Sequence, residues 1–298
     1  MMTMLPIRPL IATAMVASAT GLLAVPAQAT QQAATPTLVD VRAAHQPGLD
    51  RLVFEFSGRA PAQRDVRYVS RLIADGSGRP VSAVGDALLQ VRFRPADGHN
   101  RQGRPTYGPA RKTYALPGVI QVVKTGDFEG TLTFGVGLAR RVPYRVYTLT
   151  RPSRVVVDLA TPYRTMPVRD YFLNSADYNA GRRPYTTAVT RPVAPPATAY
   201  GALQRLFAGP TQAERAQGLR FVSSKATGFS KLTIRRGVAR VHLTGPVASG
   251  GATFTIADQI RPTLKQFPTI KWVKIYDAAG RTENPAGPSD SIPQSLEP

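Results

Sequence analysis

The 298-residue chain contains no cysteine, and this absence removes several kinds of chemistry at once. Without a thiol the protein can form no disulfide, no thiolate metal site and no cysteine nucleophile. Anchoring through a lipidated cysteine behind a signal peptide is excluded for the same reason. The fold must therefore be held by burial of the 43% of residues that are hydrophobic. An exported protein can do without disulfides.

Histidine is scarce as well, and only His45, His99 and His242 occur. No two of them are close in sequence, so the local spacing typical of a zinc site is missing. The chain also lacks a nucleophile elbow of the form G-x-S-x-G, a P-loop and a dinucleotide-binding fingerprint. These absences predict a protein with no catalytic residue, no metal ligand and no cofactor.

Long apolar runs are confined to the amino terminus. Residues 10–25 are mostly apolar and small, Arg8 precedes them, and Ala27-Gln28-Ala29 has the form of an A-x-A cleavage site. This layout predicts a signal peptide over 1–29, cleaved after Ala29 and followed by a linker over 30–37. The alternative is a membrane anchor, but the run is short for a bilayer. With no later run of that kind, we expect no transmembrane segment and a secreted or extracytoplasmic location in the cell envelope.

Acidic residues are few beside basic ones. The chain has 18 Asp and Glu against 38 Lys and Arg, which gives a formal net charge of +20. Such a field attracts polyanions, and for an exported protein these are wall polymers or anionic lipid headgroups. Nucleic acid is not expected as a partner, because there is no block of basic residues and no nucleic-acid motif. The alternative is an arginine-rich coding bias with solvated side chains.

Residues 38–160 carry the two-residue period of β-strands. Apolar side chains alternate with polar or small ones around 52–56, 89–93, 132–136 and 155–159. Turn signals at 75–78, 97–98, 117–118 and 151–153 separate these runs. The pattern predicts an all-β domain over 38–160, an antiparallel sandwich or barrel.

The period changes from about residue 161. Apolar stripes predict helices over 200–207 and 254–267, and Pro262 is expected to kink the second. Thr211 and Glu214 have the spacing of a capping box. Strands are expected over 168–173 and 271–276, with a hairpin over 232–243. These elements predict a small α+β domain over 161–298, separated from the first near 161–167.

Two groups of basic and aromatic residues are candidates for ligand binding. One is in the segment 94–112, which its glycines and prolines predict to be a long mobile loop. The other follows two expected strands around 140–154. Arginine binds phosphate and carboxylate bidentately, and tyrosine offers a flat face to a sugar. The alternative is that Tyr144 packs in the core while the arginines are only solvated. The candidates are Arg101, Arg104, Arg111, Lys112, Arg140, Arg141, Tyr144, Arg145, Tyr147 and Arg151.

Carboxylates offer the remaining candidates for chemistry. Asp127 and Glu129 flank Phe128 and are expected to point the same way on a strand. Paired carboxylates can act as acid and base, so together with His99 they define the alternative of a hydrolase that modifies the cell wall. Pairing with arginine on a sheet face is their more ordinary role. Asp158, within a run of valines, is expected to pair with Arg154.

The first region resembles a known family. The matching segments are 49–56 (LDRLVFEF), 68–69, 75–78 (DGSG), 126–130 (GDFEG) and 152–159 (PSRVVVDL). They are similar to the AMIN-like domain of exported actinobacterial proteins. AMIN domains proper occur beside peptidoglycan amidases and envelope transporters. The resemblance implies a β-sandwich that localises a protein to the wall.

The second region resembles the GerMN domain of sporulation and spore germination. It shares 171–173 (YFL), 191–193 (RPV), 202–211 (ALQRLFAGPT), 218–219, 237–243 (GVARVHL) and 263–268 (TLKQFP), in the family's order. The family brings no catalytic set, and it leaves self-association through this domain open. Together the resemblances imply an exported, non-enzymatic envelope protein. Its partner would be peptidoglycan, an anionic wall polymer or an envelope protein, and its role that of a localisation or scaffold module.

Overall fold

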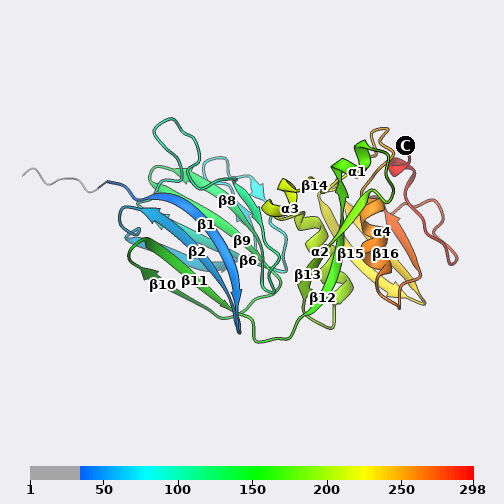
Figure 1. The fold of residues 1–298 in the computed structure, drawn as a ribbon, viewed down its shortest axis with the longest axis horizontal. Helices are drawn as coiled ribbons and strands as arrows, with labels where there is room; N and C mark the ends of the chain where they lie inside the picture. The colour runs from blue at the N-terminus through cyan, green and yellow to red at the C-terminus, as the bar shows by residue number, and fades with distance from the viewer. Residues whose placement is uncertain (1–33) are drawn as a thin grey trace, which may run out of the picture. The chain divides into compact units, whose positions relative to one another are not determined.

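The computed structural model describes residues 34–298, in which β-strands predominate (Figure 1). The signal peptide expected over 1–29, its cleavage site and residues 30–33 of the expected linker lie outside the described residues. Among the helices of residues 34–298, none has both the length and the apolar character needed to cross a membrane.

The first module, residues 37–160, contains two main antiparallel sheets. One has the strand order β1-β2-β11-β10 and the other the order β3-β6-β9-β8-β7, and a short pair β4-β5 stands beside them. The strands are β1 (Thr37–Gln46), β2 (Leu49–Ser57), β3 (Gln63–Val69), β4 (Leu72–Ile73), β5 (Pro80–Val81), β6 (Ala87–Arg94), β7 (Arg111–Thr113), β8 (Val119–Phe128), β9 (Thr131–Leu138), β10 (Tyr144–Leu149) and β11 (Ser153–Ala160).

The two sheets share one hydrophobic core, which includes the side chains that the two-residue period predicted to be buried. Phe54 of β2 and Phe93 of β6 have ring centroids 5.0 Å apart, and Phe56 lies 5.2 Å from Phe93. Edge-to-face pairs of this kind add to the free energy gained by burial. Leu132 and Val157 from the other strands are also fully buried in this core.

Acidic side chains tie the turns of the first module to its sheets. The Asp75 carboxylate accepts a hydrogen bond from the Thr133 hydroxyl at 2.7 Å and fills the space beside Gly126, where a Cβ would lie 1.9 Å from it. Fully buried Asp50 accepts from the backbone amides of Gly118 and Val119 at 2.6 and 2.8 Å. Glycine at 126 and 118 therefore allows close docking of a carboxylate.

The second module, residues 166–298, has two sheets and several helices. Sheet β13-β12-β14 is antiparallel, and sheet β15-β16-β17 joins an antiparallel hairpin to the parallel strand β17. Apolar side chains of α2, α4 and β15-β16-β17 form one core. The elements are β12 (Met166–Asn174), α1 (Ser175–Asn179), β13 (Thr186–Val193), α2 (Thr198–Ala208), α3 (Gln212–Ala216), β14 (Leu219–Arg220), β15 (Gly228–Arg235), β16 (Val238–Thr244), α4 (Ala257–Lys265), β17 (Trp272–Tyr276) and the 3-10 helix η1 (Gln294–Leu296).

Local signals in this module are largely confirmed. The capping box is present, since Glu214 N donates to the Thr211 hydroxyl and Thr211 N donates to the Glu214 carboxylate. The expected hairpin corresponds to β15 and β16. The helix expected over 254–267 is shorter, and α4 contains Pro262 in its interior.

Two expected connections are shorter in the structure. Strand β12 begins at Met166, so only residues 161–165 connect β11 to β12. The segment 94–112 is not one loop, because Arg111 and Lys112 belong to β7 and His99 forms a bridge to Pro105.

Candidate functional site

Strand β10 separates its candidate residues by the face on which each lies. Arg145 is exposed, whereas Tyr144 packs half-buried against the core and its hydroxyl donates to the Val66 carbonyl at 2.6 Å. Tyr147 lies two residues after Arg145 and therefore on the same outer face. Tyr144 thus has a structural role. This agrees with the alternative that Tyr144 packs in the core instead of binding a ligand.

The outer face of this sheet presents a tyrosine between guanidinium groups. The Arg145 guanidinium lies 5.4 Å from the centre of the Tyr147 ring, and that of Arg51 lies 5.9 Å from it. Arg51 holds Asp158 bidentately at 2.7 and 2.8 Å, and the Tyr147 hydroxyl donates to the same carboxylate at 3.1 Å. The Arg51 hydrogen bonds lower the pKa of Asp158.

The expected pair between Asp158 and Arg154 is wrong. Asp158 lies directly opposite Arg51 in the register of β11 with β2, and side chains at opposed positions share a face. The Arg154 guanidinium instead donates to the Pro152 carbonyl at 3.2 Å.

Arginines in the segment before β10 also lie over tyrosine rings. The Arg141 guanidinium is 4.5 Å from the ring centre of Tyr68, and that of Arg140 is 4.4 Å from that of Tyr163. Arg67, Tyr68 and Arg141 contribute to the lining of an open cavity of about 660 Å³. Arg67 and Tyr68 were not among the residues predicted to bind a ligand, because they come from β3, although Tyr68 is among the residues that carry the family resemblance.

The four exposed arginine candidates near this strand and half-buried Tyr147 form one group, which we name the β10 surface. Arg151 belongs to it as an exposed residue of the β10–β11 turn. The members of the β10 surface are Arg140, Arg141, Arg145, Tyr147 and Arg151.

The basic residues of the segment 94–112 differ in whether their side chains are free in solvent or bonded within the protein. Arg101 and Arg104 are exposed in the turn after His99. Lys112 is mostly buried, and its ammonium donates to the Val41 carbonyl at 2.7 Å. Arg111 donates to the Gln121 side chain and to the Ser82 carbonyl, so its guanidinium is also engaged within the protein.

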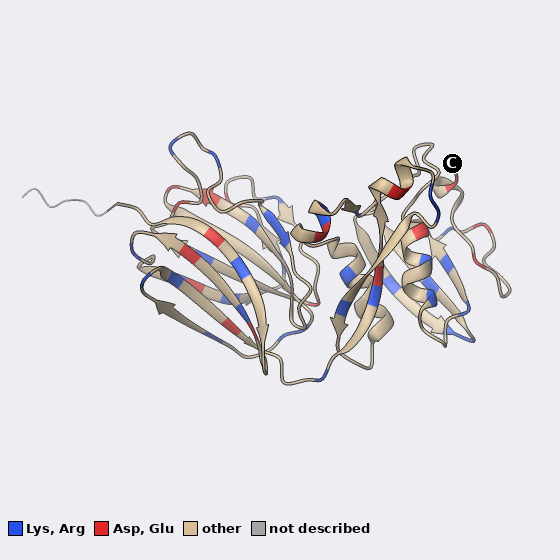
Figure 2. Ribbon diagram, viewed as in Figure 1, with Lys and Arg blue, Asp and Glu red and all other residues tan. Residues whose placement is uncertain are grey.

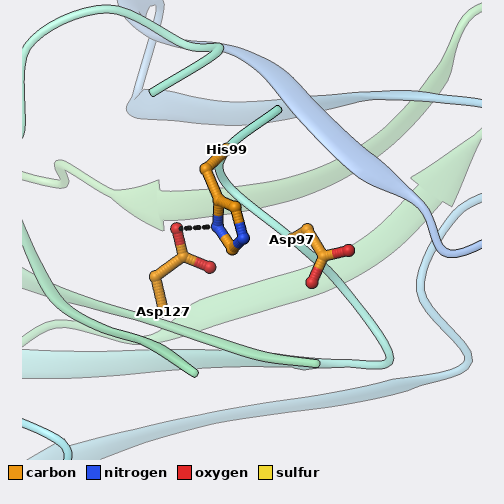
Figure 3. Close-up of side chains that lie close together, drawn as sticks. All are labelled: Asp97, His99 and Asp127. Carbon is orange, nitrogen blue, oxygen red and sulfur yellow. Dashed lines mark hydrogen bonds and ion pairs between the residues drawn. The ribbon is translucent and has the colours of Figure 1, made fainter. Parts of the chain in front are cut away.

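Three residues from the first module bring potential metal ligands together (Figure 3). His99 Nδ1 and Asp127 Oδ2 are 2.9 Å apart, and one ligand atom from each of Asp97, His99 and Asp127 lies within 4.8 Å of the others. Carboxylate and imidazole ligands suit a divalent transition metal. Exposed groups of this kind also form without an ion, and Asp127 additionally accepts from the Gly98 amide at 3.2 Å.

The carboxylate pair expected at Asp127 and Glu129 is not formed on one strand. Strand β8 ends at Phe128, and Glu129 lies exposed in the following turn with a left-handed φ of 49°. The side chain of Asp127 is instead 7% exposed and bonded to His99. Of the groups considered for acid–base chemistry, only Asp127 and His99 are in contact.

Comparison with known family models finds two separate matches along the chain. Residues 36–161 match the family model of the AMIN-like domain. Residues 170–282 match the family model described as sporulation and spore germination. The chain thus joins an AMIN-like domain to a sporulation and spore germination domain. No curated protein matches it.

One solved structure is similar to part of the chain. It contains the tandem GerMN domains of the sporulation protein GerM from Bacillus subtilis, with 18% identity and a TM-score of 0.27. The match covers 45% of this chain and 48% of that one, so this chain spans about half the length of the structure it matches.

The segments that carried the AMIN-like resemblance are joined to one another in space. Arg51 of the first segment holds Asp158 of the last. Asp75 docks on Gly126, and Asp127 closes the turn at Gly98. In this AMIN-like domain Asp75, Asp127 and Asp158 therefore connect segments that are far apart in the sequence.

Proposed function

We propose that the protein is an exported, non-enzymatic envelope protein whose AMIN-like domain binds an anionic cell-wall polymer. The observation that carries the proposal is the β10 surface, where exposed arginines flank tyrosine rings on a domain of a family associated with the envelope. Arginine recognises phosphate and carboxylate through paired donors, and an aromatic ring packs on a sugar. The protein would act as a localisation or scaffold module without turnover.

A sedimentation assay with purified wall sacculi tests the proposal. The full mature chain should sediment with sacculi that retain their anionic polymers and less with stripped sacculi. Attachment should weaken as salt rises, because charges on a surface are screened over about 8 Å at physiological ionic strength. Changing Arg141, Arg145 and Arg151 together to serine should lower the affinity about tenfold, since exposed ion pairs contribute roughly 0.2–1 kcal/mol each.

A matched control removes the same charge from elsewhere in the domain. Arg59, Arg71 and Arg79 are exposed and form no ion pair among residues 34–298. Their triple serine variant should bind almost as well as the unchanged chain. Equal losses in both variants would show that only net charge matters, and attachment indifferent to salt would refute the proposal.

The contact between His99 and Asp127 favours a second candidate, a wall hydrolase. A carboxylate that orients an imidazole is a common arrangement for a general base. Incubation with peptidoglycan should release soluble fragments if this candidate is right, and Asp127→Asn should abolish the release. The non-enzymatic proposal expects no fragments from either protein. If the protein is not an enzyme, the contact between His99 and Asp127 only holds the 98–106 turn in place. The Asp127→Asn variant should then show a more mobile 98–106 turn.

A further inference from the structure

The outer face of sheet β15-β16-β17 carries rows of cations. Lys231 lies opposite His242, Thr233 opposite Arg240, and Arg235 opposite Val238 in the hairpin register. Alternate residues of a strand share one face and are spaced by roughly 6.6–6.8 Å. The apolar side chains of the other face, such as Val241 and Ile275, pack in the core. The cations therefore face away from the core along the hairpin, whose basic residues are blue in Figure 2.

These cations line a groove of about 800 Å³ that contains no acidic residue in its lining. Among residues 34–298, none of the four basic lining residues forms an ion pair within 4.0 Å. We name this feature the hairpin groove. Its polar lining consists of Lys231, Thr233, Arg235, Arg236 and Arg240.

The opposite wall of the hairpin groove is held in place by a buried lysine. Lys274 of β17 is fully buried, and its ammonium donates to the Asn284 carbonyl, to the Ala286 carbonyl at 3.1 Å and to the Ser289 hydroxyl at 3.2 Å. Gly287 and Pro288 of this segment line the groove, together with Val238 of β16. The groove is thus a built feature with one wall fixed by charge-assisted hydrogen bonds.

The hairpin turn holds an arginine in an unfavourable conformation. Arg236 has a φ of 49° and Gly237 a φ of 77°, which is the geometry of a type I′ turn. Asparagine is favoured at the first of these positions because it tolerates the left-handed region better than arginine. A strained residue in the lining of a groove points to a role in function rather than in stability.

The positive charges of the groove lower the pKa values of neighbouring basic groups. Burial, and then the charge of Lys231, lower the pKa of His242. Burial and the charge of Arg240 likewise lower the pKa of Lys274, against an opposing effect of Asp290. An anion in the groove would relieve this repulsion.

We propose that the hairpin groove binds a linear polymer with repeated phosphate groups and without bases, a polyol phosphate of the cell wall. A row of cations at strand spacing suits a chain of charges better than one small anion. Nucleic acid fits less well, because proteins bind single strands through exposed aromatic platforms and the groove lining has no aromatic side chain. The inference depends on the proposed function only in placing the protein beside such a polymer.

Calorimetric titration of the full mature chain with poly(glycerol phosphate) tests the inference directly. Inorganic phosphate and a single-stranded oligonucleotide of equal charge serve as the comparison ligands. The variant Lys231→Gln/Arg235→Gln/Arg240→Gln should lose tenfold or more of the affinity, since each arginine or lysine contact to phosphate is charge-assisted. The control Arg164→Gln/Arg169→Gln/Arg183→Gln removes three exposed charges elsewhere and should lose less than twofold.

Arg236→Asn separates binding from folding. Asparagine suits the left-handed turn, so the variant should melt at the same temperature or higher while binding the polymer about two- to threefold more weakly. Proton NMR should also show the pKa of His242 rising when the polymer binds, because phosphate offsets the Lys231 charge.

Three results would overturn the inference. The groove variant could bind as well as the control, phosphate could bind as tightly as the polymer, or the oligonucleotide could bind at least as tightly. The assay uses purified polymer and groove variants, whereas the proposed function is tested on sacculi with variants of the β10 surface. The failure of one proposal is therefore distinguishable from the failure of the other.

Discussion

The outer sheet faces of the two domains are both basic, but they differ in how their charges are neutralised. On the AMIN-like face Arg51 holds Asp158 bidentately, and Arg42 contacts both Asp40 and Glu55. In the hairpin groove the lining cations have no carboxylate partner among residues 34–298. A cation paired with a carboxylate contributes less to the surface potential than an unpaired one, so the potentials of the two surfaces differ.

This difference changes the meaning of the net charge of +20. Residues such as Arg51 and Lys112 contribute to the count but are engaged by neighbours. Only side chains without such partners attract a polyanion at full strength. Binding should therefore follow the distribution of unpaired cations rather than their number.

The largest expected effect comes from destroying the AMIN-like core. Val157 is fully buried between the two sheets, so Val157→Asp would place a carboxylate among apolar side chains and lower the free energy of unfolding by several kcal/mol. Hydrogen exchange should show loss of amide protection in β2 and β11. A variant that keeps native protection there would contradict the assigned core.

The buried ion pair of the second domain gives the next effect. Arg191 donates to both oxygens of Glu214 at 2.7 and 2.6 Å, and its side chain is 1% exposed. Glu214→Gln would leave a buried guanidinium without its counterion, at a cost of about 3–5 kcal/mol. Chemical denaturation should show this loss, and a cost below 1 kcal/mol would mean that solvent reaches Arg191.

The same carboxylate predicts a pH dependence of stability. Burial works to raise the pKa of Glu214, but the hydrogen bonds and charge of Arg191, with those from Thr211, lower it overall. A carboxyl group with a lowered pKa stabilises the fold above its ordinary pKa, near 4.3, and this contribution is lost as the pH falls through the folded value. Melting temperatures of the unchanged chain should fall over this acidic range more steeply than those of Glu214→Gln.

A smaller change should make the AMIN-like face resemble the hairpin groove. Asp158→Asn removes the counterion of Arg51, and because the pair is partly exposed the loss of stability should be about 1 kcal/mol or less. Binding to the anionic polymer should increase, since Arg51 becomes available. The reciprocal variant Thr233→Glu should weaken polymer binding in the groove. Unchanged binding in both variants would remove pairing as the explanation of the difference between the two faces.

Features of the fold that depend on the local pattern of residues were predictable from the sequence. The alternation at 52–56 predicted which face of β2 is buried, because a two-residue period depends only on residues next to one another in the sequence. Thr211 and Glu214 gave the capping box because both partners lie within one turn. The partner of Asp158 could not be found in this way, since Arg51 is 107 residues distant and is brought opposite by register.

The candidate sites were predictable to a similar extent. The hairpin and its arginines followed from alternation, but the wall of the groove is formed by the 284–289 segment, which Lys274 holds. Nothing in the spacing of this proline-rich segment indicates that contact. Glu129 was misplaced because the strand ends one residue earlier than the pattern suggests, at a turn that needs positive φ.

The smallest expected effect concerns Arg101 and Arg104. Both are exposed and form no side-chain hydrogen bond among residues 34–298, so their double serine variant should change the free energy of unfolding by no more than about 0.5 kcal/mol. Lys112→Ser should cost more, about 1.5–3 kcal/mol, because its charge-assisted bond to the Val41 carbonyl is lost from a mostly buried position. Denaturant titrations of the two variants measure this difference in the free energy of unfolding.

Equal stabilities would mean that Lys112 is as solvated as its neighbours, and the segment 94–112 would again be a single candidate surface. A clear difference would restrict the binding candidates of this segment to Arg101 and Arg104, whose removal should then affect attachment to sacculi without affecting the fold.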